Sequence, residues 1–391
     1  MAQLAMQRQQ TVDVFRALTI VLMIVVNDLA GVTGIPGWMQ HAAADAGYMT
    51  LADLVFPAFL YIVGMSAYLS QSVSAAKSSR WRRTVQTTRR SAVLVLLGVL
   101  MVNADSGYDA SLMWLPIHLW NVLLYLAIAG IWLDWPALSG RPRVLMRSAA
   151  VLLLLLLCAS YVGQGGSTIL RPQWWGILGL IGWAAWLANL ALIWLSRRGL
   201  YLALLALICS VLWAMLTSWL PLGSAVLEQA NLLTHTQIVL MGAASAAWLI
   251  RLPAAAAATA RTKGALTLQA IALVLMVIIT CHYFPVSKIH ATPSWGWISV
   301  AACWLAYLGL ERAIKLDWLA RPVALLLPAA RHSLLLYLLP YLGFHLLRAL
   351  GGGWPQWCLQ GEVAMLITLG YMTLLFVIVA QLDKRGWQLR I

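Results

Sequence analysis

The sequence predicts an all-α protein: a polytopic bundle of about twelve (or eleven) transmembrane helices with both termini in the cytoplasm. Of the 391 residues, 62% are hydrophobic and only 10% are charged, which is far more apolar surface than a soluble domain of this length needs. Apolar stretches of the roughly 20 residues that a helix needs to cross a bilayer follow one another along the whole chain. The 21 tryptophans fit the same class, because indole rings collect at the level of the lipid headgroups.

The connections between the apolar runs are too short to hold a second, soluble domain, so we expect residues 1–391 to form a single integral-membrane domain. In chain order the expected helices lie near residues 14–33, 51–71, 88–104, 112–134, 144–162, 173–196, 199–220, 233–253, 265–284, 295–315, 325–349 and 362–382. Polar residues are sparse between 144 and 220, so the number of spans is least constrained there. We see no internal repeat of the kind that many transporters carry.

The basic residues predict the orientation of the helices. With the N-terminus inside, all but Arg171, Lys288 and Arg348 fall on the cytoplasmic side, which is 23 of 26 (26 − 3). Cytoplasmic loops retain Lys and Arg, so this partition supports an even number of spans and a bacterial inner membrane as the location. The net charge of +14 therefore indicates topology and contact with membrane lipids, and not a nucleic-acid partner.

Polar and titratable groups collect in the outer half of this topology. Six of the seven histidines lie there, and His332 alone lies near the inner surface. An ionisable residue at membrane depth is costly unless it is paired or hydrated, which makes each one a functional candidate. The five cysteines lie singly with no metal-ligand spacing, so we expect packing roles for them and no metal site.

The segment from residue 27 to residue 53 carries the richest set of candidate catalytic groups. His41 could act as a general base or as a nucleophile, and Asp53 could accept the other ring N–H and stabilise an imidazolium. Asn27 could donate its amide to a developing oxyanion. The structural alternatives are an ordinary surface histidine, an aspartate that caps the second helix and a polar rim for the first span. Asp28 and Asp45 could contact a ligand's ammonium or hydroxyl groups.

A second outer loop, CHYFPVSKIHATPSWGW, contains Lys288 and His290. Lys288 could pair with an outer aspartate or contact substrate hydroxyls, and the alternative is a lysine that snorkels to the interface. His118, His235 and His282 each start or end a span, so each taken alone is better explained by a helix end. On the inner side, the basic clusters around Arg8, Arg16 and Arg90 most often contact anionic lipids, and could also hold a phosphate group.

Several motifs resemble the heparan-α-glucosaminide N-acetyltransferase family, and within it a bacterial branch associated with N-acetylglucosamine use. They are RQQTVDVFRALTIVLMIVVND and GWMQHAAADAGYMTLADLVFPAFLYIVGMS near the N-terminus, followed by LWNVLLYLAI, THTQIVLMG, SKIHATPSWG and PAARHSLLLYLLPYL. The motifs occur in the family's order over nearly the whole chain, and the first sixty-odd residues are the most specific.

The resemblance implies a multispan acyltransferase that moves the acetyl group of cytoplasmic acetyl-CoA to the amine of glucosamine or a small amino sugar at the periplasmic side. It places the family's loop histidine on His41, the following acid on Asp53 and the helix asparagine on Asn27, with Arg8 and Arg16 at the opening motif. Asp45-Ala46-Gly47 replaces the Trp-Asn-Gly of the animal enzymes, so a heparan-like acceptor is not expected.

The resemblance leaves other aspects of the function open. It makes acetyl-CoA the co-substrate, and a homodimer follows by analogy alone. Two other functions remain: a transporter of amino sugars or oligosaccharides, against which the missing repeat argues, and an O-acyltransferase acting on envelope polysaccharide. A ping-pong route and a direct-transfer route fit the sequence equally.

Overall fold

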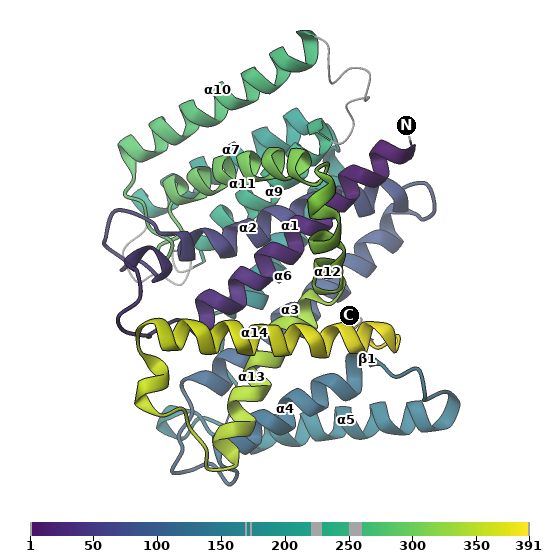
Figure 1. Cartoon of the computed structure of the whole chain (residues 1–391), viewed down its shortest axis with the longest axis vertical. Coiled ribbons are helices and arrows are strands. Elements are labelled where there is room, and N and C mark those ends of the chain that lie inside the picture. The colour runs from purple at the N-terminus through teal and green to yellow at the C-terminus, as the bar shows by residue number, and fades with distance from the viewer. Residues whose placement is uncertain (1, 169, 173, 220–228, 250–259, 390–391) are drawn as a thin grey trace. The chain divides into compact units, whose positions relative to one another are not determined.

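The computed structural model describes residues 2–168, 170–172, 174–219, 229–249 and 260–389, and these are almost entirely helical (Figure 1). The first half contains α1 (Ala2–Asp28), η1 (Gly37–Met39), α2 (Leu51–Ser74), α3 (Arg80–Asp105), α4 (Ile117–Trp132), β1 (Leu133–Asp134), α5 (Gly140–Ser160), η2 (Gln164–Gly166), α6 (Gly176–Leu190) and η3 (Ala191–Leu195). The second half contains α7 (Gly199–Trp219), α9 (Asn231–Leu249), α10 (Ala260–Tyr283), α11 (Pro293–Ala313), η5 (Asp317–Leu319), α12 (Ala320–Arg331), α13 (Ser333–Ala349), η6 (Gln356–Leu359), α14 (Gly361–Lys384) and β2 (Gln388–Leu389). The all-α prediction is confirmed.

Among the described residues, nine helices are long and apolar enough to cross a membrane, and the protein is a multi-pass membrane protein. A further span is possible if α11 and Asp317–Arg331, which meet at a bend of 103°, count as one broken span. The apolar helices α4 and α13 are shorter, at 16 and 17 residues. Every expected span therefore corresponds to a helix, while the count of twelve stays a prediction. The expected ends at 220 and 250–253 lie outside the described residues.

Several helices differ from the expected boundaries: α3 begins earlier than expected, at Arg80, and α4 begins later, at Ile117. Helix α1 ends at Asp28 and not near residue 33, because the segment that follows contains Gly31 and Gly34, both with positive φ. The expected helix at 325–349 is interrupted at His332, whose φ of −113° and ψ of 30° are not helical. The His332 ring is buried and its Nε2 lies 2.8 Å from a carboxylate oxygen of Asp383, so a side-chain contact stabilises the break.

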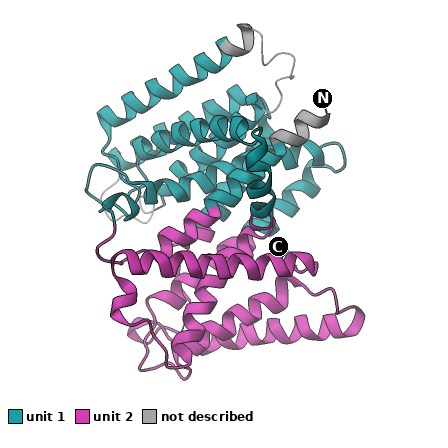
Figure 2. Ribbon diagram, in the orientation of Figure 1, with its two compact units in different colours: residues 1–19, 36–91, 180–327 teal, residues 20–35, 92–179, 328–391 magenta. Residues whose placement is uncertain are grey.

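The chain divides into two compact units, coloured separately in Figure 2. Unit 1 comprises residues 1–19, 36–91 and 180–327, and unit 2 comprises residues 20–35, 92–179 and 328–391. Four helices, α1, α3, α6 and α12, contribute their two ends to different units.

Helix α9 forms the core of unit 1, where it packs against α2, α7 and α11. Small residues on α9 let the backbones approach closely, as is typical of helix contacts in membranes. At the crossing with α2, a Cβ added to Gly64 would lie 1.9 Å from the carbonyl oxygen of Val239. A Cβ on Gly242 would lie 2.0 Å from that of Tyr61. The crossing is therefore possible only with glycine at both positions.

Unit 2 is built from α4 and α5, which pack against each other, and from α13, which packs against α4 and α14. The buried Trp120 of α4 donates its indole N–H to the carbonyl of Leu157 on α5. The short strands β1 and β2 pair antiparallel, with Leu133 opposite Leu389.

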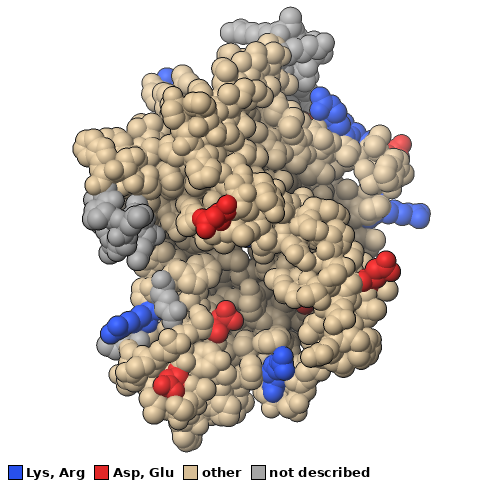
Figure 3. All heavy atoms as spheres, turned by 90° about the vertical axis from the view of Figure 1, so that its left-hand side faces the viewer, with Lys and Arg blue, Asp and Glu red and all other residues tan. Residues whose placement is uncertain are grey.

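Charged side chains are few and scattered on the face shown in Figure 3, where neutral residues predominate. Many large apolar side chains on α5, α7, α10 and α14 are exposed, Leu155, Leu204, Leu268 and Leu366 among them. In a soluble protein such a surface would be an aggregation liability, whereas in a bilayer it is the surface that meets lipid.

Gly64→Ala is expected to destabilise unit 1, because its methyl group must displace backbone atoms of α9. Overpacking of this kind typically costs about 1–3 kcal/mol, and a rigid backbone neighbour puts the substitution at the upper end. The measurement is the melting temperature of the detergent-purified protein. Gly309→Ala on α11 is the matched control, since a Cβ there meets nothing within 4 Å and alanine favours the helix, so the melting temperature should stay the same or rise slightly. Equal melting of both variants and the wild type would contradict the analysis.

Candidate functional site

Asp53 lies in the first turn of α2, and one of its carboxylate oxygens organises the loop before that helix. Oδ2 accepts hydrogen bonds from the backbone N–H of Ala42 at 3.1 Å and of Thr50 at 3.2 Å, and from the Thr50 hydroxyl at 3.2 Å. Thr50 and Asp53 form a capping box, in which the acid at the third helical position bonds back to the N-cap residue. Asp53 is therefore a helix cap, as the structural alternative expected.

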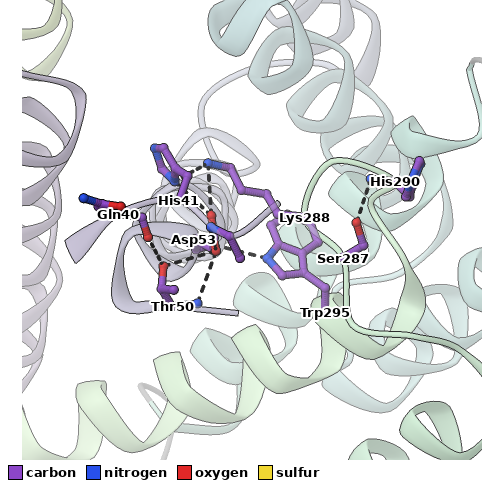
Figure 4. A network of polar contacts seen from close by, with 9 residues as sticks. Gln40, His41, Thr50, Asp53, Ser287, Lys288, His290 and Trp295 are labelled. Carbon is purple, nitrogen blue, oxygen red and sulfur yellow. Dashed lines mark hydrogen bonds and ion pairs between the residues drawn. The ribbon is translucent and has the colours of Figure 1, made fainter. Parts of the chain in front are cut away.

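The other carboxylate oxygen of Asp53 faces His41, so the same residue also has the predicted partner. Nδ1 of His41 lies 2.9 Å from Oδ1 of Asp53 (Figure 4). The Asp53 side chain is 1% exposed and the His41 side chain is 33% exposed, so a buried carboxylate supports a partly accessible imidazole. With its proton on Nδ1 and donated to Asp53, the ring keeps a lone pair on Nε2 for chemistry.

Lys288 is the third member of this cluster. Its Nζ lies 3.6 Å from Oδ1 of Asp53 and 3.1 Å from Nδ1 of His41. A neutral ring nitrogen cannot donate to Asp53 and accept from Lys288 at once. Since a carboxylate only accepts, the arrangement that satisfies Asp53 has His41 as donor, with Lys288 as a neighbouring cation. Burial lowers the pKa of the Lys288 ammonium below its ordinary value of 10.5, and the Asp53 carboxylate opposes this shift.

The loop between α10 and α11 is tied to the loop before α2. The Ser287 hydroxyl donates to the carbonyl of Ala44 at 2.7 Å. Within the α10–α11 loop, the backbone N–H of Thr292 donates to the carbonyl of Ser287 at 3.1 Å, and Ala291 adopts a positive φ of 46°. These contacts hold Lys288 over Asp53. His290 and Asp45 also approach each other, at 3.4 Å, but their side chains are 57% and 95% exposed.

Trp295 contacts the backbone of Asp53 and was not among the residues predicted from the sequence. Its buried indole N–H donates to the backbone carbonyl of Asp53 at 3.2 Å, and its ring meets the buried ring of His235 edge-on. His235 also packs edge-on against Phe56 of α2. Thr50 and Ser287 were missed as well. The Thr-x-x-Asp spacing of the capping box was the one signal in the sequence that could have pointed to Thr50.

The two remaining candidates of the first loop belong to the other unit. Asn27 lies half-buried in the last turn of α1, next to Asp28, and both are part of unit 2. The Asp28 carboxylate accepts a hydrogen bond from the hydroxyl of Thr368 on α14. The geometry of unit 1 therefore brings together His41, Asp53 and Lys288, and does not include Asn27.

The arginines predicted to bind phosphate do not form one cluster through any described contact. Arg16 donates to Asp13 at 2.9 Å and to the hydroxyl of Ser66 at 2.6 Å. Arg90 is exposed on α3. The side chain of Arg8 lies outside the described part of the chain.

The histidines predicted on the outer side separate into several environments. His41 contacts Asp53, whereas His235 is buried in the core of unit 1, where its ring packs against Trp295. In unit 2, Nδ1 of His118 lies 3.1 Å from Nδ1 of His345. His282 is exposed and stacks edge-on against Tyr283. His41 and His290 both have a carboxylate at hydrogen-bond distance, and they differ in that Asp53 is buried whereas Asp45 is 95% exposed.

The family model described as heparan-alpha-glucosaminide N-acetyltransferase, catalytic, matches residues 8–162. The first part of the chain is therefore similar to the catalytic region of that family. The human heparan-alpha-glucosaminide N-acetyltransferase is similar at 34% identity over 99 residues, and the mouse protein of the same name at 35% over 99 residues. Each match covers 25% of this chain and only 14% of the relative.

The region shared with the acetyltransferase family holds His41, Asp53, Asn27 and the three candidate arginines. Lys288, His290 and Trp295 lie beyond it. The second loop of the site is thus contributed by a part of the chain that the family model does not match.

Asp53→Asn is expected to destabilise the protein, because an amide cannot match a carboxylate that accepts four hydrogen bonds around its two oxygens. Loss of charge-assisted hydrogen bonds costs about 1.5–3 kcal/mol each. The measurement is again the melting temperature in detergent. Asp45→Asn, at a carboxylate that is 95% exposed, is the control and should melt like the wild type. A wild-type melting temperature for Asp53→Asn would exclude a structural role for the carboxylate.

Lys288 is expected to react with an amine-acylating reagent at a lower pH than the exposed Lys77 and Lys315. Its lowered pKa leaves more neutral, nucleophilic amine at a given pH, so the midpoint of its own labelling curve moves to lower pH. Site-resolved mass spectrometry across a pH series measures this midpoint. Asp53→Asn should lower it further, because the carboxylate that favours the charged amine is gone. A shared midpoint for all three lysines would contradict the assigned environment.

Proposed function

We propose that this protein is a transmembrane N-acetyltransferase that moves the acetyl group of cytoplasmic acetyl-CoA to the amine of glucosamine or a small amino sugar at the periplasmic side. The single observation that carries the proposal is the His41–Asp53 pair, a partly accessible imidazole 2.9 Å from a buried carboxylate, within the residues 8–162 that match this acetyltransferase family. Each element of that pair matches what acyl transfer requires: a base or nucleophile and a group that orients it.

Two routes use the same geometry. In direct transfer, the nitrogen of the sugar amine attacks the thioester carbonyl while Nε2 of His41 removes a proton from that amine, and the CoA thiolate leaves. In the two-step route, Nε2 itself attacks the carbonyl, the CoA thiolate leaves, and the amine then displaces the imidazole from the acetyl group. In both, Asp53 holds the Nδ1–H and stabilises the positive charge that develops on the ring.

Other residues are assigned supporting roles. Asn27 donates its amide to the oxyanion of the tetrahedral intermediate. Asp28, Asp45, Lys288 and His290 contact the acceptor. Arg8, Arg16 and Arg90 hold the phosphates of acetyl-CoA, because guanidinium groups bind phosphates bidentately.

The membrane setting explains why such an enzyme is useful. Acetyl-CoA is made in the cytoplasm and is too large and too charged to cross a bilayer, whereas its acetyl group is small and neutral. An enzyme with twelve spans and inside termini in a bacterial inner membrane delivers that group alone to the far side. The basic residues that favour this orientation support the assignment. A homodimer follows from analogy with the family.

The test is acetyl transfer by the purified protein in detergent, with radiolabelled acetyl-CoA supplied with and without glucosamine. Wild type is expected to form labelled N-acetylglucosamine, and His41→Ala to do so at least about 100-fold more slowly, the effect of losing a general base or nucleophile. His282→Ala, at an exposed histidine whose ring packs against Tyr283, should retain the wild-type rate. Near-wild-type transfer by a correctly folded His41→Ala would reject the assigned role.

The same preparation separates the proposal from the other functions that the sequence left open. Thioester that stays intact, together with glucosamine uptake by reconstituted vesicles, would establish a carrier. Acetyl transfer to envelope polysaccharide that free glucosamine does not inhibit would establish an O-acyltransferase.

A further inference from the structure

A groove of about 460 Å³ lies between α7 and α10 in unit 1, beside α9 and α11, and is called the α7–α10 groove below. Its walls include Leu200 and Leu204 of α7, Leu268 and Met276 of α10, and Trp304 of α11. None of the described residues that line it is charged. Its volume is within the roughly 300–1,000 Å³ of ligand sites, so a ligand that fills it must be apolar over most of its length.

The groove exists because α7 and α10 each pack against another helix. Helix α7 packs against α9, and α10 packs against α11 (Figure 1). The sides of α7 and α10 that line the groove remain accessible, and Leu200 and Leu268 there are 63% and 68% exposed. Both helices are long and apolar enough to span a membrane, so the groove opens to the hydrocarbon of the bilayer. Its occupant is therefore drawn from the membrane and not from water.

The groove is about as long as one leaflet of a bilayer is thick. Ala265 and Met276 are the first and last lining residues of α10 and lie eleven residues apart, which is about 16 Å along a helix that rises 1.5 Å per residue. The hydrocarbon core of a bilayer is about 30 Å thick, so one leaflet supplies about 15 Å. A single acyl chain from one leaflet matches this length, whereas a spanning helix of about 20 residues is too long.

A polar side chain, Gln269 of α10, lies among these apolar residues. Its Oε1 accepts a hydrogen bond of 3.3 Å from the indole N–H of Trp304, and its amide N–H groups donate to no described residue. A polar group at membrane depth is costly unless it has a partner. Gln269 lies four residues, about 6 Å, beyond Ala265, which is close to the end of the groove where a lipid headgroup would lie. The ester carbonyl of a phospholipid is an acceptor at that level.

Basic residues lie where both walls of the groove begin. Arg197 and Arg198 directly precede α7, and Arg261 and Lys263 belong to the first turn of α10. Neither Arg197 nor Arg198 forms an ion pair with a described carboxylate. The charge of Arg197 also acts on the like charge of Arg83 on α3. Basic residues at the end of a lipid-facing groove attract an anionic headgroup.

We propose that the α7–α10 groove binds one acyl chain of an anionic phospholipid, whose ester carbonyl accepts from Gln269 and whose phosphate lies against Arg197 and Arg198. Guanidinium groups bind phosphate oxygens through paired hydrogen bonds. The bound chain fills the space between α7 and α10 and so supports α10, which ends at Tyr283, shortly before Lys288. The lipid is thus a structural component of unit 1, and its binding does not depend on which reaction the protein catalyses.

The experiment is native mass spectrometry of the full-length protein in detergent, titrated with phosphatidylglycerol or with phosphatidylcholine. Wild type is expected to retain one phosphatidylglycerol at least about ten-fold more tightly than phosphatidylcholine, because each arginine near the headgroup contributes to binding an anionic lipid. Lysophosphatidylglycerol, which has a single chain, should bind like phosphatidylglycerol, because one chain occupies the groove.

Two substitutions test the two parts of the site. Ala272→Trp places an indole in the groove from an exposed position on α10 and should weaken phosphatidylglycerol binding at least about ten-fold, since the chain loses buried methylene groups. Arg198→Gln should lower the affinity for phosphatidylglycerol toward that for phosphatidylcholine and leave the latter unchanged. Val274→Trp, at an exposed position of the same helix outside the groove, is the control and should bind like the wild type. Melting temperatures without lipid report whether each variant is folded.

Equal retention of phosphatidylglycerol by folded Ala272→Trp and Val274→Trp would overturn the groove as the binding site. Equal binding of the two lipids by the wild type, or unchanged selectivity in Arg198→Gln, would overturn the anionic headgroup. A retained polyprenyl phosphate in place of a phospholipid, or a lipid-free dimer, would show that another occupant fills the groove and would also overturn the proposal.

Discussion

The arrangement of the candidate site depends on one carboxylate with two different tasks. Oδ2 of Asp53 accepts the backbone groups that end the preceding loop and begin α2, while Oδ1 faces His41 and Lys288. Because capping holds the side chain in one position, the oxygen that faces the imidazole cannot move away from it. The sequence posed a helix cap and a partner of His41 as alternatives, and in the folded protein the same aspartate makes both sets of contacts.

A second constraint is the close crossing of α2 and α9. The paired glycines Gly64 and Gly242 bring the two backbones into contact near the middle of α2, and Trp295 of α11 packs near its start. The helix that carries Asp53 is thus held along its length by other helices of unit 1. Rigid elements position reacting groups more accurately than loops do, and here a rigid helix supports a loop histidine.

Hydropathy predicted the helical class and the order of the spans well, because an apolar run of membrane length has few other solutions. It could not predict the break at His332, which depends on a contact with Asp383, 51 residues later. Motif resemblance pointed to His41 and Asp53, and a loop lysine was correctly chosen as a possible partner of an aspartate. Trp295 and Ser287 escaped prediction because their roles are backbone contacts across the fold, which leave no local pattern.

The separation of the site residues along the chain has a consequence for biosynthesis. Lys288 contacts His41 across 247 residues, and Trp295 contacts Asp53 across 242. A nascent chain inserts its helices into the membrane in order. When α2 enters the bilayer, Asp53 is therefore in place before Lys288 and Trp295 have been inserted. The cluster is complete only after α10 and α11 have been inserted. An intermediate in which only residues 8–162 have been inserted would contain His41 and Asp53 but would still lack Lys288 and Trp295.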